Sequence, residues 1–299
     1  MAYRRSWQRD FDRSIREHPD WPVVVSDGDS WFSYPHEKNI VDYLDEPVAR
    51  PGAHGEVGEA GEPMSQRDWS LLRLERTDDE ILAMLRGGER AFLNELLARY
   101  EVDALLFSGG GNDLLGADIG GMLKRYVAGA TAADCLIEKR WTRRLRQVED
   151  CCRELIDIVL DDGADLKVLV NSYDIPPASR EETKLLGGRN PGPWLRPALD
   201  AKGYPAGSPL EREIPKVILD RFCAMLDRVS NDCPTRFYRV ETRGAVGTEW
   251  ADEIHPNARG ARAVADRFER ELQRLGLVQS SRPQKAAQEP PVRAVRRAS

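Results

Sequence analysis

Three short, separated segments carry side chains that together could transfer an acyl group. Segment 28–30, Gly-Asp-Ser, follows the apolar run 23–25 and offers a serine hydroxyl. Segment 110–113, Gly-Gly-Asn-Asp, follows the apolar run 105–107 and offers a side-chain amide. Segment 252–256 places a carboxylate three residues before an imidazole. Acyl-transfer enzymes use these groups as nucleophile, oxyanion donor, and base with its orienting acid.

Each segment also has a simpler interpretation when it is taken alone. The first is a common turn at the end of a strand, and the second contains typical turn residues. The third could be a capped loop before the last helix. The glycines at 109–111 are not followed by Gly-Lys-Ser/Thr, which argues against a phosphate-binding P-loop. The occurrence of all three segments in this order therefore carries the chemical interpretation.

Apolar and helical patterns alternate along the chain and predict how these segments come together. Strands are expected at 21–28, 70–75, 102–108, 166–171 and 235–241, and helices at 77–85, 89–100, 132–160, 210–229 and 258–275. This alternation indicates a parallel sheet covered on both faces. In a flavodoxin-like 2-1-3-4-5 order, the first and third strands flank the switch point where ligands bind. We therefore expect Ser30 and Asn112 in one crevice.

The same patterns divide the chain into one large domain with flanking segments. We expect an N-terminal extension at 1–20, a catalytic-type domain at 21–278, and a disordered tail at 279–299. Long loops rich in Gly and Pro are predicted at about 46–68 and 175–209. Trp194 and Tyr204, in the second loop, would either shape a pocket or anchor the packing.

Composition excludes several classes of function. The 299 residues are 41% hydrophobic and 31% charged, and the net charge of −6 gives no reason to expect a nucleic-acid partner. No secretory signal and no run of about 18 apolar residues is found, which predicts a cytoplasmic protein without a membrane span. The five cysteines do not have the spacing of a metal site, and we expect them to be reduced and buried. They are Cys135, Cys151, Cys152, Cys223 and Cys233.

Taken together, the three segments resemble the motifs of the SGNH hydrolases, also called the GDSL esterase/lipase family. The resemblance implies a three-layer α/β/α sandwich. It also implies that Ser30 is the nucleophile, that His255 is the base, and that Asp252 orients the imidazole. Asn112 and the backbone N–H of Ser30 would hold the oxyanion, while Gly110 matches the glycine that opens the family's third block. No metal or organic cofactor is implied.

The sequence departs from the family pattern at two places. The second block usually offers a glycine whose backbone N–H completes the oxyanion hole, but the matching stretch 73–78 has no glycine. An acidic side chain beside the oxyanion would be unfavourable unless it points away, and loss of one donor would cost roughly 3 kcal/mol. Trp31 also replaces the aliphatic residue that usually follows the serine.

The expected activity is cleavage of a small or medium acyl ester through an acyl-enzyme on Ser30. Acyl-sugar, lysophospholipid and thioester substrates all remain open, and the oligomeric state is not predicted. The alternative is a non-catalytic binding protein that retains the hydrolase fold. It is supported by the missing second-block glycine and by the basic tail, and it is opposed by the presence of all four expected site residues.

Overall fold

The computed structural model describes residues 2–46, 48–49, 64–65, 68–76, 80–116, 118–161, 165–177 and 194–278. Its centre is a five-stranded sheet in which every pairing is parallel. The strands are β1 (Val23–Gly28), β4 (Ser70–Arg73), β5 (Ala104–Ser108), β6 (Lys167–Asn171) and β7 (Phe237–Val240). Their order in the sheet, β4-β1-β5-β6-β7, is the predicted 2-1-3-4-5 order. The predicted fold class is confirmed.

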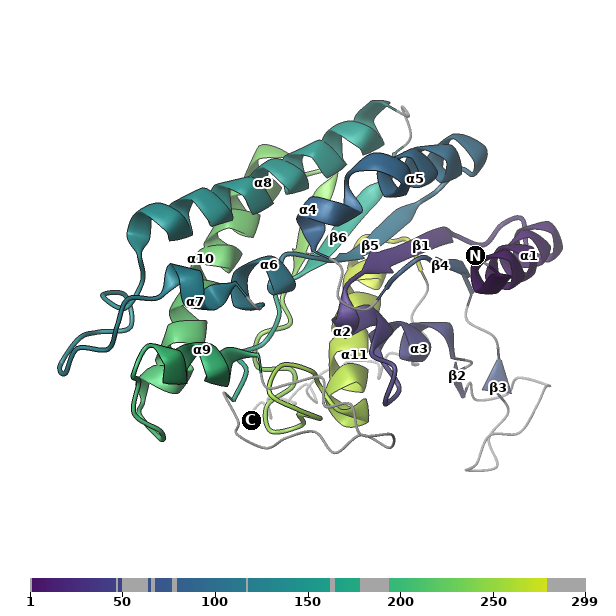
Figure 1. Ribbon diagram of the computed structural model, residues 1–299. Coiled ribbons are helices and arrows are strands. Elements are labelled where there is room, and N and C mark those ends of the chain that lie inside the picture. The colour runs from purple at the N-terminus through teal and green to yellow at the C-terminus, as the bar shows by residue number, and fades with distance from the viewer. Residues whose placement is uncertain are drawn as a thin grey trace, which may run out of the picture.

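The central strands are mostly apolar, as expected where helices cover both faces of the sheet. All five residues of β5 are buried, as are four of the five in β6. One layer contains α4 (Ile81–Met84), α5 (Gly87–Arg99), α8 (Glu138–Asp161) and α10 (Leu210–Asp232), and the other contains α3 (Ile40–Asp45) and α11 (Ala258–Arg274) (Figure 1). Pro215 lies in the second turn of α10.

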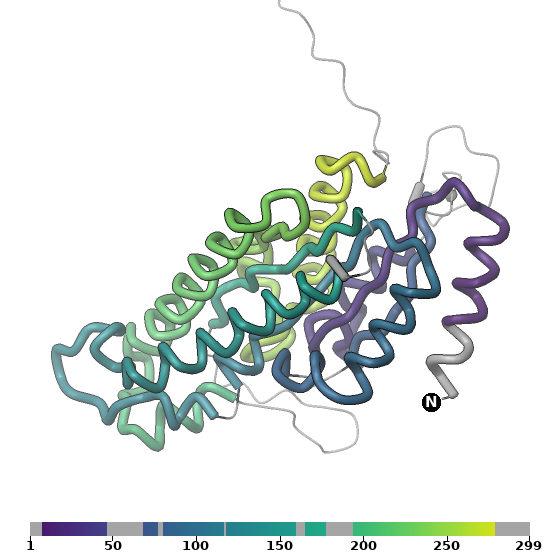
Figure 2. Tube along the Cα trace, turned by 90° about the horizontal axis from the view of Figure 1, so that it is seen from above, coloured from purple at the N-terminus to yellow at the C-terminus, as the bar shows by residue number. Residues whose placement is uncertain are grey.

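Helix α1 (Ala2–Glu17) lies at the β4 edge of the sheet in both views (Figures 1 and 2). The sequence predicted only an extension here, without a helix. Phe11 is 2% exposed, and its ring meets the edge of Tyr100 at 5.1 Å. The Oγ atoms of Ser14 and Ser70 are 2.7 Å apart. The described part of segment 1–20 is thus packed onto the same core as the sheet.

The predicted loops are described only in part. In the first, β2 (Val48–Ala49) and β3 (Met64–Ser65) form a small antiparallel pair. In the second, the loop prediction was wrong for 195–201, which form α9 (Leu195–Ala201). Several of the predicted segments lie outside the described residues. These are 47, 50–63 and 66–67 in the first loop, 178–193 in the second, 77–79 at the expected start of a helix, and the tail 279–299. Three short helices were also not predicted: α2 (Ser30–Ser33), α6 (Gly111–Leu115) and α7 (Ile119–Met122).

Within the ranges that the structure describes, no helix is both long enough and apolar enough to cross a membrane.

Candidate active site

Ser30 is placed by a tight turn at the carboxyl end of β1. Gly28 ends the strand, where a Cβ atom would lie 2.8 Å from the Cβ of Ser108, so only glycine fits without a shift. Asp29 then caps α2, since its Oδ1 accepts a hydrogen bond from the backbone N–H of Trp31 at 3.1 Å. Ser30 is consequently the first residue of α2, at the edge of the sheet where ligands bind in this fold.

Ser30, His255 and Asp252 form one continuous chain of hydrogen bonds. The Oγ atom of Ser30 is 2.8 Å from Nε2 of His255. Nδ1 of the same ring is 2.8 Å from Oδ2 of Asp252 and 3.0 Å from its Oδ1. All three side chains are buried, although Ser30 lies 225 positions before His255 in the sequence. The arrangement can carry a proton from the serine hydroxyl to an imidazole that a carboxylate orients.

The carboxylate of Asp252 is held in its ionised form. Burial raises its pKa, but hydrogen bonding and charge from His255, with the backbone N–H groups of Ile254 and His255, outweigh burial and leave the pKa below its ordinary value. These N–H groups donate to Oδ1 at 2.9 and 2.8 Å. Tyr34 donates its hydroxyl to Oδ2 at 2.8 Å. Tyr34 was not predicted as a site residue, although it lies only four residues after Ser30.

Aromatic rings enclose the imidazole of His255. Tyr34 stacks on it with 4.4 Å between the ring centroids, and Trp194 meets it edge-on at 5.0 Å. Trp31, the residue that departs from the family pattern, donates its indole N–H to the carbonyl of Ile254 at 3.0 Å. Tyr204, by contrast, packs on Tyr126 and donates its hydroxyl to a backbone carbonyl away from this cluster. Of the two aromatic residues noted in the second loop, Trp194 alone contacts the site.

Asn112 lies beside Ser30, as predicted. The two residues line one cavity together with Trp31, Leu115, Ile254, Pro176 and Tyr173. Asn112 is the second residue of α6, which begins after Gly110. Gly110 has φ +101°, a backbone conformation that L side chains rarely adopt, so glycine is required at the turn that aims Asn112.

Glu75, one of the two acidic residues in the second-block stretch 73–78, points away from the cavity. Glu75 accepts hydrogen bonds from Ser26 Oγ and Arg73 Nε, each at 2.7 Å. The next backbone N–H, that of Arg76, donates to the carbonyl of Gly28 at 2.9 Å and so continues the pairing with β1. The side chain of Glu75 therefore does not lie beside the expected position of the oxyanion. Positions 77 and 78 lie outside the described residues.

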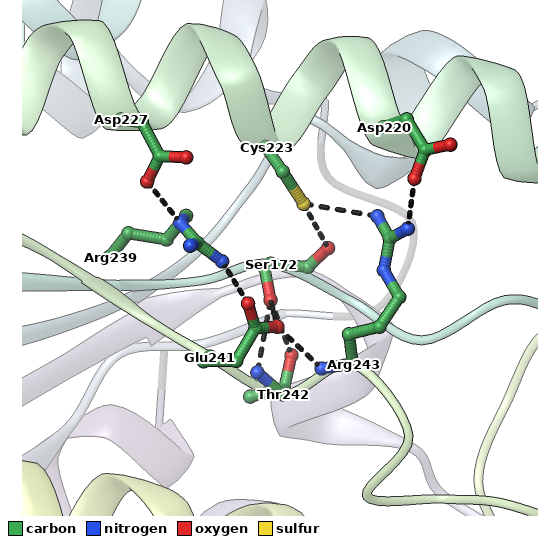
Figure 3. A network of polar contacts seen from close by, with 8 residues as sticks. All are labelled: Ser172, Asp220, Cys223, Asp227, Arg239, Glu241, Thr242 and Arg243. Atoms are coloured by element: carbon green, nitrogen blue, oxygen red, sulfur yellow. Dashed lines mark hydrogen bonds and ion pairs between the residues drawn. The ribbon is translucent and has the colours of Figure 1, made fainter.

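Polar contacts fix the start of the loop that bears Asp252 and His255 (Figure 3). Arg239 joins Asp227 of α10 at 2.6 Å and Glu241 at 2.5 Å. Ser172 Oγ accepts the backbone N–H of Thr242 at 3.0 Å. These contacts tie the chain leaving β7 to α10 and to the end of β6. The first residues of this loop are therefore held by contacts to α10 and to Ser172.

A second set of contacts follows along the same loop. Asp174 Oδ2 accepts the N–H of Val246 at 2.9 Å. Further on, the buried carboxylate of Glu253 accepts the backbone N–H groups of Trp194, Leu195 and Arg196. Glu253, which follows Asp252 directly in the sequence, thereby binds the first turn of α9. This role was not predicted, since nothing local distinguishes Glu253 from a solvated glutamate.

No group of three or more His, Cys, Asp or Glu side chains could hold a metal ion in the described part of the chain. All five cysteines are described and free of disulfides. Three are buried, whereas Cys223 and Cys233 are half-buried, so the prediction of burial was wrong for these two. Burial raises the pKa of the Cys151 thiol to about 11, which makes it a poor nucleophile at neutral pH.

Comparison with solved structures shows the fold. The lipase Lip_vut3 from a goat rumen metagenome superposes with a TM-score of 0.50 at 14% identity, covering 83% of this chain and 96% of the lipase. The aryl esterase of M. smegmatis is 15% identical over 85% of this chain and 99% of its own, with a TM-score of 0.44. No family model matches the chain. No curated protein matches its sequence either.

Proposed function

We propose that this protein is a serine hydrolase that cleaves a carboxylic ester through an acyl-enzyme on Ser30. The observation that carries the proposal is the hydrogen-bonded chain Ser30–His255–Asp252 at a cavity that Asn112 also lines. The same three groups in the same order support nucleophilic catalysis on unrelated folds, where geometry rather than sequence position identifies them. The likeness in fold to a lipase agrees with this assignment.

In the first step, Ser30 Oγ attacks the ester carbonyl carbon while its proton passes to Nε2 of His255. The carbonyl oxygen becomes an oxyanion, which the Asn112 amide and the Ser30 backbone N–H stabilise. The carbon–oxygen bond to the alcohol then breaks, and His255 returns the proton to the departing alkoxide. Asp252 stabilises the imidazolium that exists between the two proton transfers.

In the second step, water replaces the alcohol. His255 takes a proton from water, and the resulting hydroxide attacks the acyl-enzyme. The bond to Ser30 Oγ breaks as His255 protonates that oxygen. The products are a carboxylic acid and an alcohol, and the enzyme is regenerated. None of these steps calls on a metal or an organic cofactor.

The substrate is a small or medium acyl ester. Trp31, Leu115, Pro176 and Ile254 give the cavity beside Ser30 an apolar wall suited to an acyl chain. Acyl-sugar, lysophospholipid and thioester substrates share the carbonyl that the mechanism needs. These three substrate classes are separated by a panel that contains each of them with increasing acyl length, compared by kcat/KM. A cytoplasmic location stays a prediction.

The first test is intact mass after treatment with a fluorophosphonate, followed by peptide mapping. We expect one adduct, located on Ser30, and no adduct on Ser30→Ala. Ser30→Ala should also abolish ester turnover while it unfolds at the same temperature as the wild type. A Ser30→Ala variant with full turnover would overturn the assignment.

The alternative, a non-catalytic binding protein, makes the opposite prediction. In that case the folded protein takes up no fluorophosphonate, because an unactivated serine hydroxyl is a weak nucleophile. A folded wild-type protein without an adduct would therefore favour the binding protein over the hydrolase.

A further inference from the structure

We propose that Tyr173 is a positioning residue that holds the two oxyanion donors, the Ser30 backbone and Asn112, at a fixed separation. The inference rests on the proposed function and adds a residue outside the three motifs. Tyr173 follows the end of β6, which lies next to β5 in the sheet. The two donors follow other strands, Ser30 after β1 and Asn112 after β5. Its side chain reaches across the carboxyl edge of the sheet to both turns.

The hydroxyl group of Tyr173 contacts the turns on both sides. It donates to Oδ2 of Asp29, the residue before Ser30, at 2.5 Å. The same oxygen lies against Gly111, the residue before Asn112, where a Cβ atom would be too close to it. A single hydroxyl group therefore contacts both the residue that precedes one oxyanion donor and the residue that precedes the other.

The fit around this phenol is close. A Cβ atom on Gly111 would lie 2.8 Å from Cζ of Tyr173 and 3.1 Å from its hydroxyl oxygen, so the absence of a side chain at 111 lets the ring approach. The edge of Trp31 meets the ring at 5.0 Å, and Phe222 packs against it at 5.8 Å. Tyr173 is 4% exposed, and its ring cannot leave without opening the core.

The backbone of Tyr173 is strained. Its φ is +57°, and it is the one residue other than glycine with a positive φ in the part of the chain that the structure describes. Bulky residues rarely adopt this conformation, and such strain persists only where surrounding contacts enforce it, often at functional sites. Here the strain directs the side chain from the end of β6 toward Asp29 and Gly111.

Tyr173 also affects the ionisation of Asp29. Burial raises the pKa of that carboxyl to about 6, and the hydrogen bonds from Tyr173, Ser108 and the Trp31 N–H work against this rise. The imidazole of His255, when it carries a proton, also lowers the pKa of Asp29. Only the ionised carboxylate accepts from all three donors at once. The turn that carries Ser30 is therefore best held above the pKa of Asp29.

The test compares Tyr173→Phe with Tyr204→Phe. Tyr204 is a suitable control because it is equally buried and also loses a hydroxyl hydrogen bond, to the carbonyl of Lys124 at 3.1 Å, away from the cavity. Turnover is expressed per serine that reacts with fluorophosphonate, so molecules that fail to fold do not count. For Tyr173→Phe we expect kcat to fall roughly 10- to 100-fold with KM within about twofold, since donor placement matters most in the transition state.

The pH profile provides the second readout. Loss of the Tyr173 hydroxyl removes a hydrogen bond that lowers the pKa of Asp29, so the acidic limb of kcat should move to higher pH in Tyr173→Phe and stay in place in Tyr204→Phe. Equal kcat per labelled serine in the two variants, with coincident acidic limbs, would overturn the role of Tyr173. A wild-type Ser30 that does not react would instead overturn the proposed function itself.

Discussion

The Tyr34 hydroxyl and the imidazole of His255 bind the same oxygen of Asp252, each at 2.8 Å. Burial, followed by the nearby Asp252 carboxylate, raises the pKa of Tyr34, so its hydroxyl remains a donor throughout the neutral range. The ring of Tyr34 is also stacked on His255. One side chain thus fixes both the acid and the base of the proposed triad.

Replacing Tyr34 with Phe should lower kcat/KM about tenfold. The substitution retains the stacking ring but removes a hydrogen bond to a charged group, which is worth about 1.5 kcal/mol, and ~1.4 kcal/mol corresponds to a tenfold change in rate. Steady-state kinetics on one ester checks the value. Tyr238→Phe, on β7, is the control and should retain its activity. Equal kcat/KM in the two variants would contradict this role of Tyr34.

Replacing Glu253 with Gln should lower the free energy of unfolding by about 2 kcal/mol, because the amide has one oxygen in place of two and leaves at least one of the three backbone N–H groups without an acceptor. It should also lower kcat/KM, because Trp194 packs on His255. Urea unfolding and ester kinetics measure the two effects. Glu249→Gln is the matched control, since its amide oxygen can still accept from Asn257, and a change below about 0.5 kcal/mol is expected. The role of Glu253 would be contradicted if the two variants unfold alike.

Asp113 should make the protein less stable as the pH rises from about 4 to about 6. Burial raises the pKa of this carboxyl from 3.8 to about 6, so the folded chain binds more protons than the unfolded chain in that window. A shift of about two pH units corresponds to roughly 3 kcal/mol. Asp113→Asn retains an acceptor for the N–H of Ile81, which now bonds Asp113 at 2.9 Å, and removes the charge.

Urea unfolding of both proteins across this pH range provides the measurement. We expect the loss of stability between pH of about 4 and about 6 to be smaller in Asp113→Asn than in the wild type. Asp29 has a raised pKa as well, so part of the slope should remain in the variant. Parallel slopes in the two proteins would show that Asp113 ionises as freely in the folded chain as in the unfolded one.

Replacing Phe11 with Ala should destabilise the whole protein by roughly 3–5 kcal/mol, the usual cost of removing a buried phenylalanine ring. The expectation follows from the position of Phe11 in the common core with Tyr100. Val127→Ala is the control, since Val127 is 65% exposed. Urea unfolding gives both values. A small effect of Phe11→Ala would mean that α1 detaches independently of the sheet.

The sheet and the central site residues could be predicted because both depend on local signals. Apolar, β-branched runs such as 23–25 predict buried strands, and glycine-containing turns mark where those strands end. The strand order then places the turns at 28–30 and 110–113 side by side. Ser30, Asn112, Asp252 and His255 were therefore candidates from the sequence, and the structure places them around one cavity and one chain of hydrogen bonds.

The supporting residues could not be predicted because their partners are distant in sequence. Tyr34 lies 218 positions from Asp252, and Tyr173 lies 144 from Asp29. A tyrosine in a loop carries no mark of the carboxylate that it will meet. Helix α9 was missed for a similar reason, because its first N–H groups are satisfied by Glu253 and its own sequence includes a proline.

The position of α1 bears on how copies of this protein behave toward one another. Among the described strands, β4 pairs with β1 alone and so forms an edge of the sheet. Open edges offer unpaired backbone groups to strands of other chains. Helix α1 lies against this edge, with Ser14 on Ser70. A chain shortened to begin at residue 21 would leave β4 uncovered. Self-association through added strands is then expected, together with the loss of stability that removal of Phe11 brings.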